Sequence, residues 1–202
     1  MDQQSAIEEI ALIRRVMDES RRFALDNGKY YLLWGALITV AIFAQYALIL
    51  TNNKGIAELW LWIVTIGIGW LVSSLFGMRE ASGPSGWPIG AKLVALVWAS
   101  TGVVMTIIGF AGPFSGGLHS WAICPALAAV MGGSYAISSL IYRLKWVAFV
   151  GVAWWLGSLL MFTVKGIATL PIFGFMMILF QILPGLVFYR MWKRNSMTAG
   201  AK

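Results

Sequence analysis

Six long apolar segments without a charged side chain dominate this sequence. They lie at about residues 30–50, 59–78, 93–112, 121–142, 146–164 and 169–189, and none contains Asp, Glu, Lys, Arg or His. Each is about 19 to 22 residues long, which in an α-helix matches the hydrocarbon layer of a bilayer, ~30 Å thick. Membrane-spanning strands are about half as long and alternate polar with apolar residues. The segments therefore predict an all-α, polytopic integral membrane protein with six transmembrane helices.

The basic residues between these segments predict the orientation of the chain. Of the 15 Lys and Arg residues, 13 fall on one side when the chain is threaded through six spans, and only Lys54 and Lys165 fall on the other. Basic loops stay in the cytoplasm, so we expect cytoplasmic N and C termini in the inner (cytoplasmic) membrane of a bacterium. The net charge of +7 is then a topology signal, and we expect no nucleic-acid partner.

The same threading predicts three parts. Residues 1–29 form a cytoplasmic amphipathic helix, residues 30–189 form the six-helix transmembrane bundle, and residues 190–202 form a short basic cytoplasmic tail. The loops on the side opposite the termini are too short to hold a folded domain.

The N-terminal segment is the one extramembrane element large enough to bind a partner. Ser5 and Glu8 have the spacing of a capping box, which predicts the start of a helix. Ile10, Ile13 and Met17 then recur on one helical face and are the residues that we expect to dock on another protein. The alternative is that this N-terminal helix packs on its own transmembrane bundle and docks on no partner. Residues 1–29 carry six acidic and five basic side chains. This near-neutral balance argues against a polybasic membrane anchor.

Reactive groups are scarce in this chain. General acid–base or covalent catalysis requires an activated group beside a partner, and the six segments contain no ionisable carboxylate, histidine or lysine. His119 and Cys124 are the one pair with ligand-like identities, and two ligands do not make a structural metal site. We therefore expect no catalytic residues, no metal and no cofactor.

Several polar and aromatic residues at membrane depth are candidates for a solute path. Glutamine has more hydrogen-bonding capacity than hydrocarbon can satisfy, so it is expected to face protein. Proline frees helical carbonyl groups, here near residue 180. Tryptophan rings can line a site for an apolar or quaternary-ammonium ligand, or they can simply pack. The candidates are Gln45, Gln181, Pro184, Trp98, Trp154 and Trp155.

Small residues recur at four-residue spacing in the fourth segment. Such rows let two helix backbones approach closely in a membrane. One row is Ala128, Gly132 and Ala136, and the second is Ala129 and Gly133. They place this helix at the centre of the bundle or at a homo-oligomer interface.

Three classes of function follow. We favour a non-enzymatic membrane anchor, regulator or subunit of a larger assembly that contacts a protein partner through its N-terminal helix, because the spans offer no reactive group. A transporter or channel-like protein for a neutral or hydrophobic small molecule, with a Trp-lined path, is the alternative. A lipid enzyme embedded in the membrane is the least supported of the three.

Overall fold

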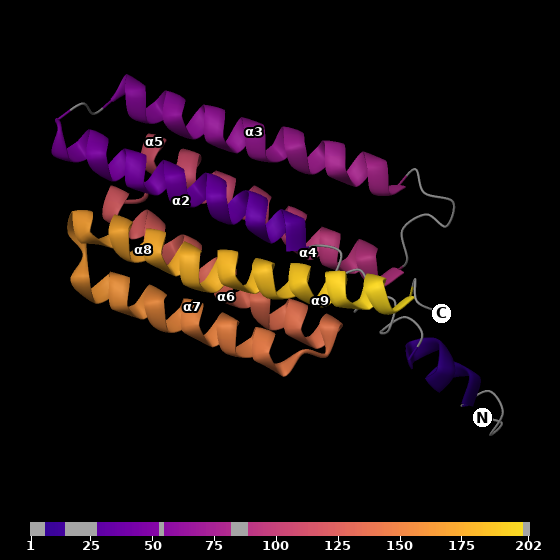
Figure 1. The fold of residues 1–202 in the computed structure, drawn as a ribbon. Coiled ribbons are helices and arrows are strands. Elements are labelled where there is room, and N and C mark those ends of the chain that lie inside the picture. Colours follow the sequence, from indigo (N-terminus) through magenta and orange to yellow (C-terminus); the bar gives the residue numbers. More distant parts are fainter. Residues whose placement is uncertain (1–6, 15–27, 53–54, 82–88, 200–202) are drawn as a thin grey trace.

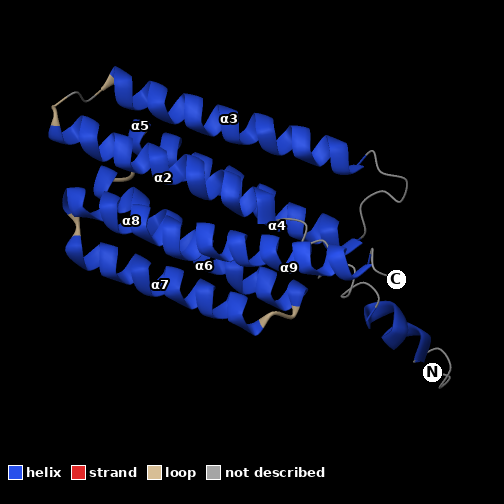
Figure 2. Ribbon diagram, viewed as in Figure 1, coloured by secondary structure: helices blue, strands red, loops and turns tan. Residues whose placement is uncertain are grey.

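The computed structural model describes residues 7–14, 28–52, 55–81 and 89–199. Within these ranges the chain is helical apart from short turns and contains no strand (Figure 2). Six of its helices are long and apolar enough to cross a membrane, namely Gly28–Leu50, Ile56–Glu80, Lys92–Phe114, Ser120–Tyr142, Lys145–Val164 and Gly166–Arg194. The predicted all-α fold with six apolar spans is therefore confirmed.

Four spans are single α-helices and two are composite. The single helices are α2 (Gly28–Leu50), α3 (Ile56–Ala81), α6 (Ser120–Tyr142) and α7 (Lys145–Val164). The third span joins α4 (Ile89–Thr106), the π-helical turn η1 (Ile107–Ala111) and α5 (Gly112–Phe114). The last joins a 3₁₀ turn, η2 (Gly166–Ala168), to α8 (Thr169–Met177), the π-helical turn η3 (Ile178–Ile182) and α9 (Leu183–Ala199).

A proline follows each π-helical turn at the same distance. Pro113 lies two residues after the end of η1, and Pro184 lies two residues after the end of η3. Proline lacks the N–H of a regular helix turn and its ring collides with the carbonyl four residues earlier. A widened turn avoids this collision. In each case the N–H just after the turn bonds to the carbonyl five residues back, from Gly112 to Ile107 and from Leu183 to Ile178.

Helix α6 lies at the centre of the bundle and α3 at its edge. Half of the most apolar 18-residue stretch of α6 is buried, and α6 and α7 form the most extensively packed pair of helices. The last span packs along α2, while α4 packs on α6. Helix α3 lies along the outer edge, where its backbone packs chiefly on α2 (Figure 1).

Polar contacts along the length of α3 attach this edge helix to α2. Near the termini, Lys29 and Glu80 form an ion pair of 2.5 Å, and the Tyr30 hydroxyl donates to Glu80 at 3.2 Å. Farther along the two helices, Trp34 Nε1 donates to the Ser73 hydroxyl at 3.0 Å. At the opposite end the Gln45 amide donates to the Glu58 carboxylate and accepts from Trp62 Nε1 at 3.2 Å.

Residues 7–14 and the C-terminal end of α9 lie at the same end of the bundle (Figure 1). Residues 7–14 are helical there, whereas Ser5 of the expected capping box and Met17 lie outside the described residues. Helix α9 runs on to Ala199, so the described part of the predicted basic tail is a continuation of the last helix.

Candidate functional site

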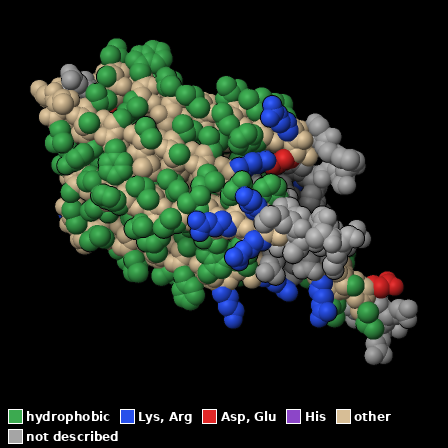
Figure 3. Space-filling model, in the orientation of Figure 1, with side chains coloured by type: hydrophobic (Ala, Val, Ile, Leu, Met, Phe, Trp, Pro, Cys, Tyr) green, Lys and Arg blue, Asp and Glu red, His purple; other side chains and the backbone are tan. Residues whose placement is uncertain are grey.

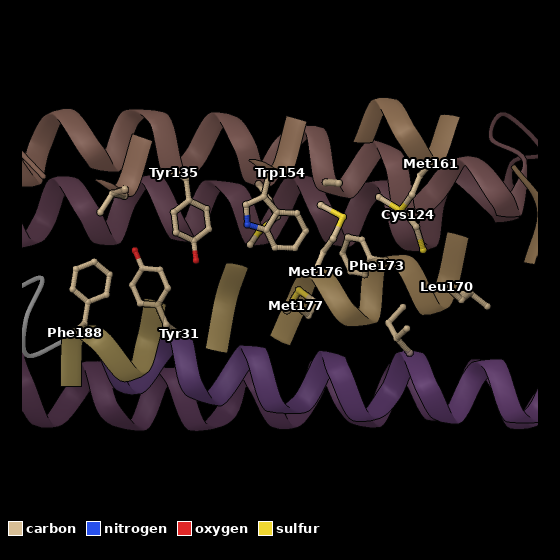
Figure 4. Close-up of a cluster of buried hydrophobic side chains, with 14 of the residues drawn as sticks. Tyr31, Cys124, Tyr135, Trp154, Met161, Leu170, Phe173, Met176, Met177 and Phe188 are labelled. Atoms are coloured by element: carbon tan, nitrogen blue, oxygen red, sulfur yellow. The ribbon is translucent and has the colours of Figure 1, made fainter. Parts of the chain in front are cut away.

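Six aromatic rings from five helices meet inside the half of the bundle that carries the termini. We call them the aromatic cluster: Tyr31 of α2, Trp98 of α4, Tyr135 and Tyr142 of α6, Trp146 of α7 and Phe188 of α9. The Tyr31 ring is central, with centroids 5.1 Å from Trp98 and 5.3 Å from Phe188. Figure 4 shows Phe188 beside Tyr31, and the side chains of Tyr31 and Tyr135 entering the bundle interior from opposite sides.

The cluster fills a region where the helix backbones are far apart. Helix α9 packs closely on α2, and α4 packs closely on α6, but α2 and α4 share few close backbone contacts in the described chain, as do α6 and α9. Large rings bridge these distances. Phe188 reaches across from α9 to Tyr142 and Trp146, with centroids 5.9 and 5.0 Å apart. The centre of this half is therefore built from side chains rather than from direct helix contacts.

Gln181 adjoins the cluster and is buried, with 3% of its surface exposed. It lies in the π-helical turn η3, and its Oε1 accepts a hydrogen bond of 2.6 Å from the Tyr135 hydroxyl. In a membrane interior an unpaired hydroxyl is costly, so this bond accounts for the presence of both polar groups at depth.

The Pro184 region joins α7 to the last span. Because Pro184 has no N–H to donate to the carbonyl of Phe180, that carbonyl needs another donor, and Trp154 Nε1 supplies it at 3.3 Å. Trp154 is fully buried and packs its ring against Phe173. Four of the candidate path residues, Gln181, Pro184, Trp154 and Trp98, thus lie around the aromatic cluster or next to it.

Two further candidates lie elsewhere. The Trp155 ring is 42% exposed on the outer side of α7, where it covers Gly132 and donates to the carbonyl of Ala129 at 3.0 Å. Gln45 lies at the far end of α2 and binds Glu58. Neither residue joins the other four.

The two rows of small residues have different neighbours. A Cβ on Gly151 of α7 would lie 2.9 Å from the carbonyl oxygen of Gly132 and 3.2 Å from the nitrogen of Ala136, so the first row allows close approach of α6 and α7. Ala128 of this row is fully buried. In the second row Ala129 is exposed, and a Cβ on Gly133 would meet nothing within 4 Å.

The tyrosines are the residues that the sequence interpretation missed. Tyr135 lies in the middle of an apolar span, and a hydroxyl at that depth signals a hydrogen-bonding partner in protein. Tyr31 and Tyr142 lie close to span ends, where tyrosine is common at the lipid interface, so sequence alone did not distinguish them from interfacial residues.

Four buried polar atoms around the cluster lack a hydrogen-bond partner among the described residues: Tyr31 Oη, Trp98 Nε1, Ser138 Oγ and Tyr142 Oη. Cys124 is buried, and no group of three His, Cys, Asp or Glu residues that could hold a metal ion occurs in the described part of the chain.

No protein family, curated protein or solved structure matches this chain.

Proposed function

We propose that this protein is a non-enzymatic membrane anchor, regulator or subunit that docks on a protein partner through its N-terminal helix. The observation that carries the proposal is the exposure of apolar side chains outside the six spans. Ile7, Ile10, Leu12 and Ile13 are exposed by 62, 54, 60 and 53%. Apolar side chains that neither cross a membrane nor pack on their own protein mark an interaction surface.

The distribution of charge supports a cytoplasmic position for this helix. On the face of the molecule that Figure 3 shows, the Lys and Arg side chains gather toward the end where residues 7–14 and the end of α9 lie. The flank of the bundle on this face is largely apolar. Under the positive-inside rule this end faces the cytoplasm of a bacterial cell. The partner is then a cytoplasmic protein or the cytoplasmic part of a membrane protein.

Deletion of residues 1–25 tests this proposal. A photoreactive residue placed at position 12 of the full chain should cross-link to the partner and so identify it. We expect the deleted protein to insert and purify like the full chain but no longer to co-purify with that partner. Ile10→Asp with Ile13→Asp should reproduce the loss, and Glu9→Gln should not. If the deleted protein fails to fold, the helix packs on its own bundle and the proposal is wrong.

Self-association is a further part of this proposal. The exposed Ala129 and the open Gly133 on α6 offer a face on which a second copy could approach closely. A cysteine at position 133, in a chain whose Cys124 is replaced by Ala, should cross-link to its counterpart in the membrane if the chain forms a homo-oligomer through this face. Absence of the cross-linked dimer would remove the homo-oligomer from the proposal.

A second candidate function is the binding or passage of a neutral small molecule through the bundle. Its support is the aromatic cluster, which gathers polar groups inside the bundle between the span ends at Tyr31 and Tyr142 and the buried Gln181. Uptake of a neutral solute into liposomes that survives deletion of residues 1–25 and is lost in Gln181→Leu would favour this function over the first.

A further inference from the structure

The polar atoms without a hydrogen-bond partner sit on rings that pack together in the aromatic cluster. The Tyr31 ring lies 5.1 Å from Trp98, and Tyr31 and Tyr142 both pack on Phe188, at 5.3 and 5.9 Å between centroids. Among the described residues, Tyr31 Oη, Tyr142 Oη and Trp98 Nε1 meet no partner at hydrogen-bond geometry. All three atoms are inaccessible to solvent. Three polar groups from α2, α4 and α6 are thus carried by rings that pack in one cluster.

Ser138 adds a fourth polar group on the same helix. It lies three residues after Tyr135 and four before Tyr142, and therefore on the same face of α6. A serine within a helix commonly donates to a carbonyl of the preceding turn, as Ser134 does to Val130 and Ser139 does to Ala136. The Ser138 hydroxyl makes no such bond in the described chain although it is fully buried.

The chemistry of these groups selects a hydrogen-bond acceptor. The Trp98 indole nitrogen can only donate, and each hydroxyl also has a hydrogen to donate. The charged residues of the spans lie at their ends, and the apolar segments 30–50, 59–78, 93–112, 121–142, 146–164 and 169–189 contain no Asp or Glu that could balance a cation and no Lys or Arg that could balance an anion. A neutral molecule that carries an acceptor oxygen fits both conditions.

The rings around these donors select the body of the ligand. Tyr31, Trp98, Tyr135 and Phe188 surround the place with aromatic surface, and their mutual centroid distances of 5.1 to 5.8 Å are those of edge and tilted ring contacts. An apolar, ring-containing molecule can replace such contacts with its own. A molecule of this kind also partitions into the bilayer and can approach through lipid.

We infer that the aromatic cluster is a binding site for a neutral, apolar molecule with a carbonyl-type oxygen, which accepts hydrogen bonds from Tyr31, Trp98 and Tyr142. The inference rests on the second proposed function, a small-molecule role for the bundle, and deepens it by naming the class of ligand. It is independent of the N-terminal helix.

Photolabelling of the full-length protein in detergent with benzophenone tests the inference, since this probe is itself an aromatic ketone. We expect saturable labelling that maps to peptides containing Tyr31, Trp98 or Tyr142. Fluorenone should protect against labelling, while fluorene, which has the same shape without the oxygen, should protect roughly five- to tenfold less well because it lacks the hydrogen bond.

Variants that keep the ring and remove the hydroxyl provide the second arm. Tyr31→Phe and Tyr142→Phe should each weaken fluorenone protection by roughly fivefold and leave fluorene protection unchanged. Tyr189→Phe is the matched control, because Tyr189 lies on the exposed side of α9. Unchanged elution on gel filtration would show that the variants are folded.

Several results would overturn the inference. Labelling that does not saturate and is spread over lipid-facing helices would mean that water alone satisfies the donors. Protection by tetraethylammonium rather than fluorenone would assign the site to cations. Saturable labelling without solute uptake into liposomes would reject transport and leave the site standing, whereas uptake without such labelling would reject the site.

Discussion

At the scale of single residues, the polar side chains of this protein depend on particular partners. Gln181 and Tyr135 come from η3 and α6 and meet in a buried hydrogen bond of 2.6 Å. Lys29 and Glu80 meet at the end of the bundle near the termini, where the Lys29 ammonium also lies 5.1 Å from the centre of the Phe76 ring. In a low-dielectric interior the loss of one partner costs more than the bond contributes, because the other is left without a replacement.

The Gln181 bond gives a prediction at this scale. Gln181→Leu should lower the free energy of unfolding in detergent by about 1–3 kcal/mol, because the Tyr135 hydroxyl then has no acceptor. Tyr135→Phe combined with Gln181→Leu should cost less than the sum of the two single changes, since no unpaired group remains. Thermal unfolding of the unchanged protein, the two single variants and the double variant measures these costs. A double variant that loses the sum of the two single losses would contradict the pairing.

At the scale of elements, the bundle is held by close backbone approach in one place and by side-chain bridges in another. Gly151 lies against the Gly132 carbonyl, and Gly28 of α2 similarly lies against the Gly185 carbonyl of α9, 2.8 Å from where a Cβ would be. Small residues at such crossings allow dispersion contacts between backbones, which replace the hydrophobic drive that lipid removes. Elsewhere, as in the aromatic cluster, large rings fill the space between helices.

A pair of glycine substitutions tests the close approach of α6 and α7. Gly151→Ala should destabilise the protein by about 1–3 kcal/mol, because the new methyl group would collide with backbone rather than with a movable side chain. Gly133→Ala, where a Cβ meets nothing within 4 Å, should change stability by no more than about 0.5 kcal/mol. Thermal unfolding in the same detergent compares the two, and similar losses would contradict the assigned crossing.

The widened turn before Pro184 gives a second prediction for an element. Trp154→Phe should cost about 1–2 kcal/mol beyond any packing loss, because the Phe180 carbonyl loses its donor. In a Pro184→Ala background the new backbone N–H can serve that carbonyl, so the same Trp154→Phe change should cost less. A double-mutant cycle measured by thermal unfolding gives the coupling, and a coupling of zero would show that the two groups act independently.

At the scale of the whole molecule, the arrangement separates a densely packed group of helices from a loosely attached edge. Helix α6 and the last span bury 50 and 44% of their most apolar stretches, whereas the spans of α3 and α4 each bury only 11%. Polar contacts of α3 with α2 at both ends accompany this shallow apolar packing. Exposed apolar side chains cover the flanks of the bundle, as expected of a surface that faces lipid.

Orientation in the membrane is the prediction that belongs to the whole molecule. In a Cys124→Ala background, a cysteine at Ser115 should react with a membrane-impermeant maleimide added to intact cells, whereas a cysteine at Lys145 should react only after permeabilisation. Both positions are exposed and lie at opposite ends of α6. The reverse labelling pattern would place the termini outside and would reject a cytoplasmic N-terminal helix.

The number of spans and the class of fold could be predicted from the sequence because both depend on local properties. A run of about 20 uncharged apolar residues must form a helix in lipid, whatever its neighbours are, since every backbone polar group has to be paired within the segment. The proline effect near residue 180 was predictable for the same reason. The composite last span was not, because a proline alone does not specify that a π-helical turn accommodates it.

The sequence by itself determined that this chain is a six-span helical membrane protein, and only the tertiary structure decided which polar groups meet. Gln45 and Gln181 are the same residue type, and both lie within apolar segments, but one binds an edge carboxylate and the other a buried tyrosine. The physical reason is that lipid and protein interior are equally apolar, so the sequence pattern of a span does not show which face is buried. Helix rotation and packing therefore brought Tyr31, Trp98 and Tyr142 together.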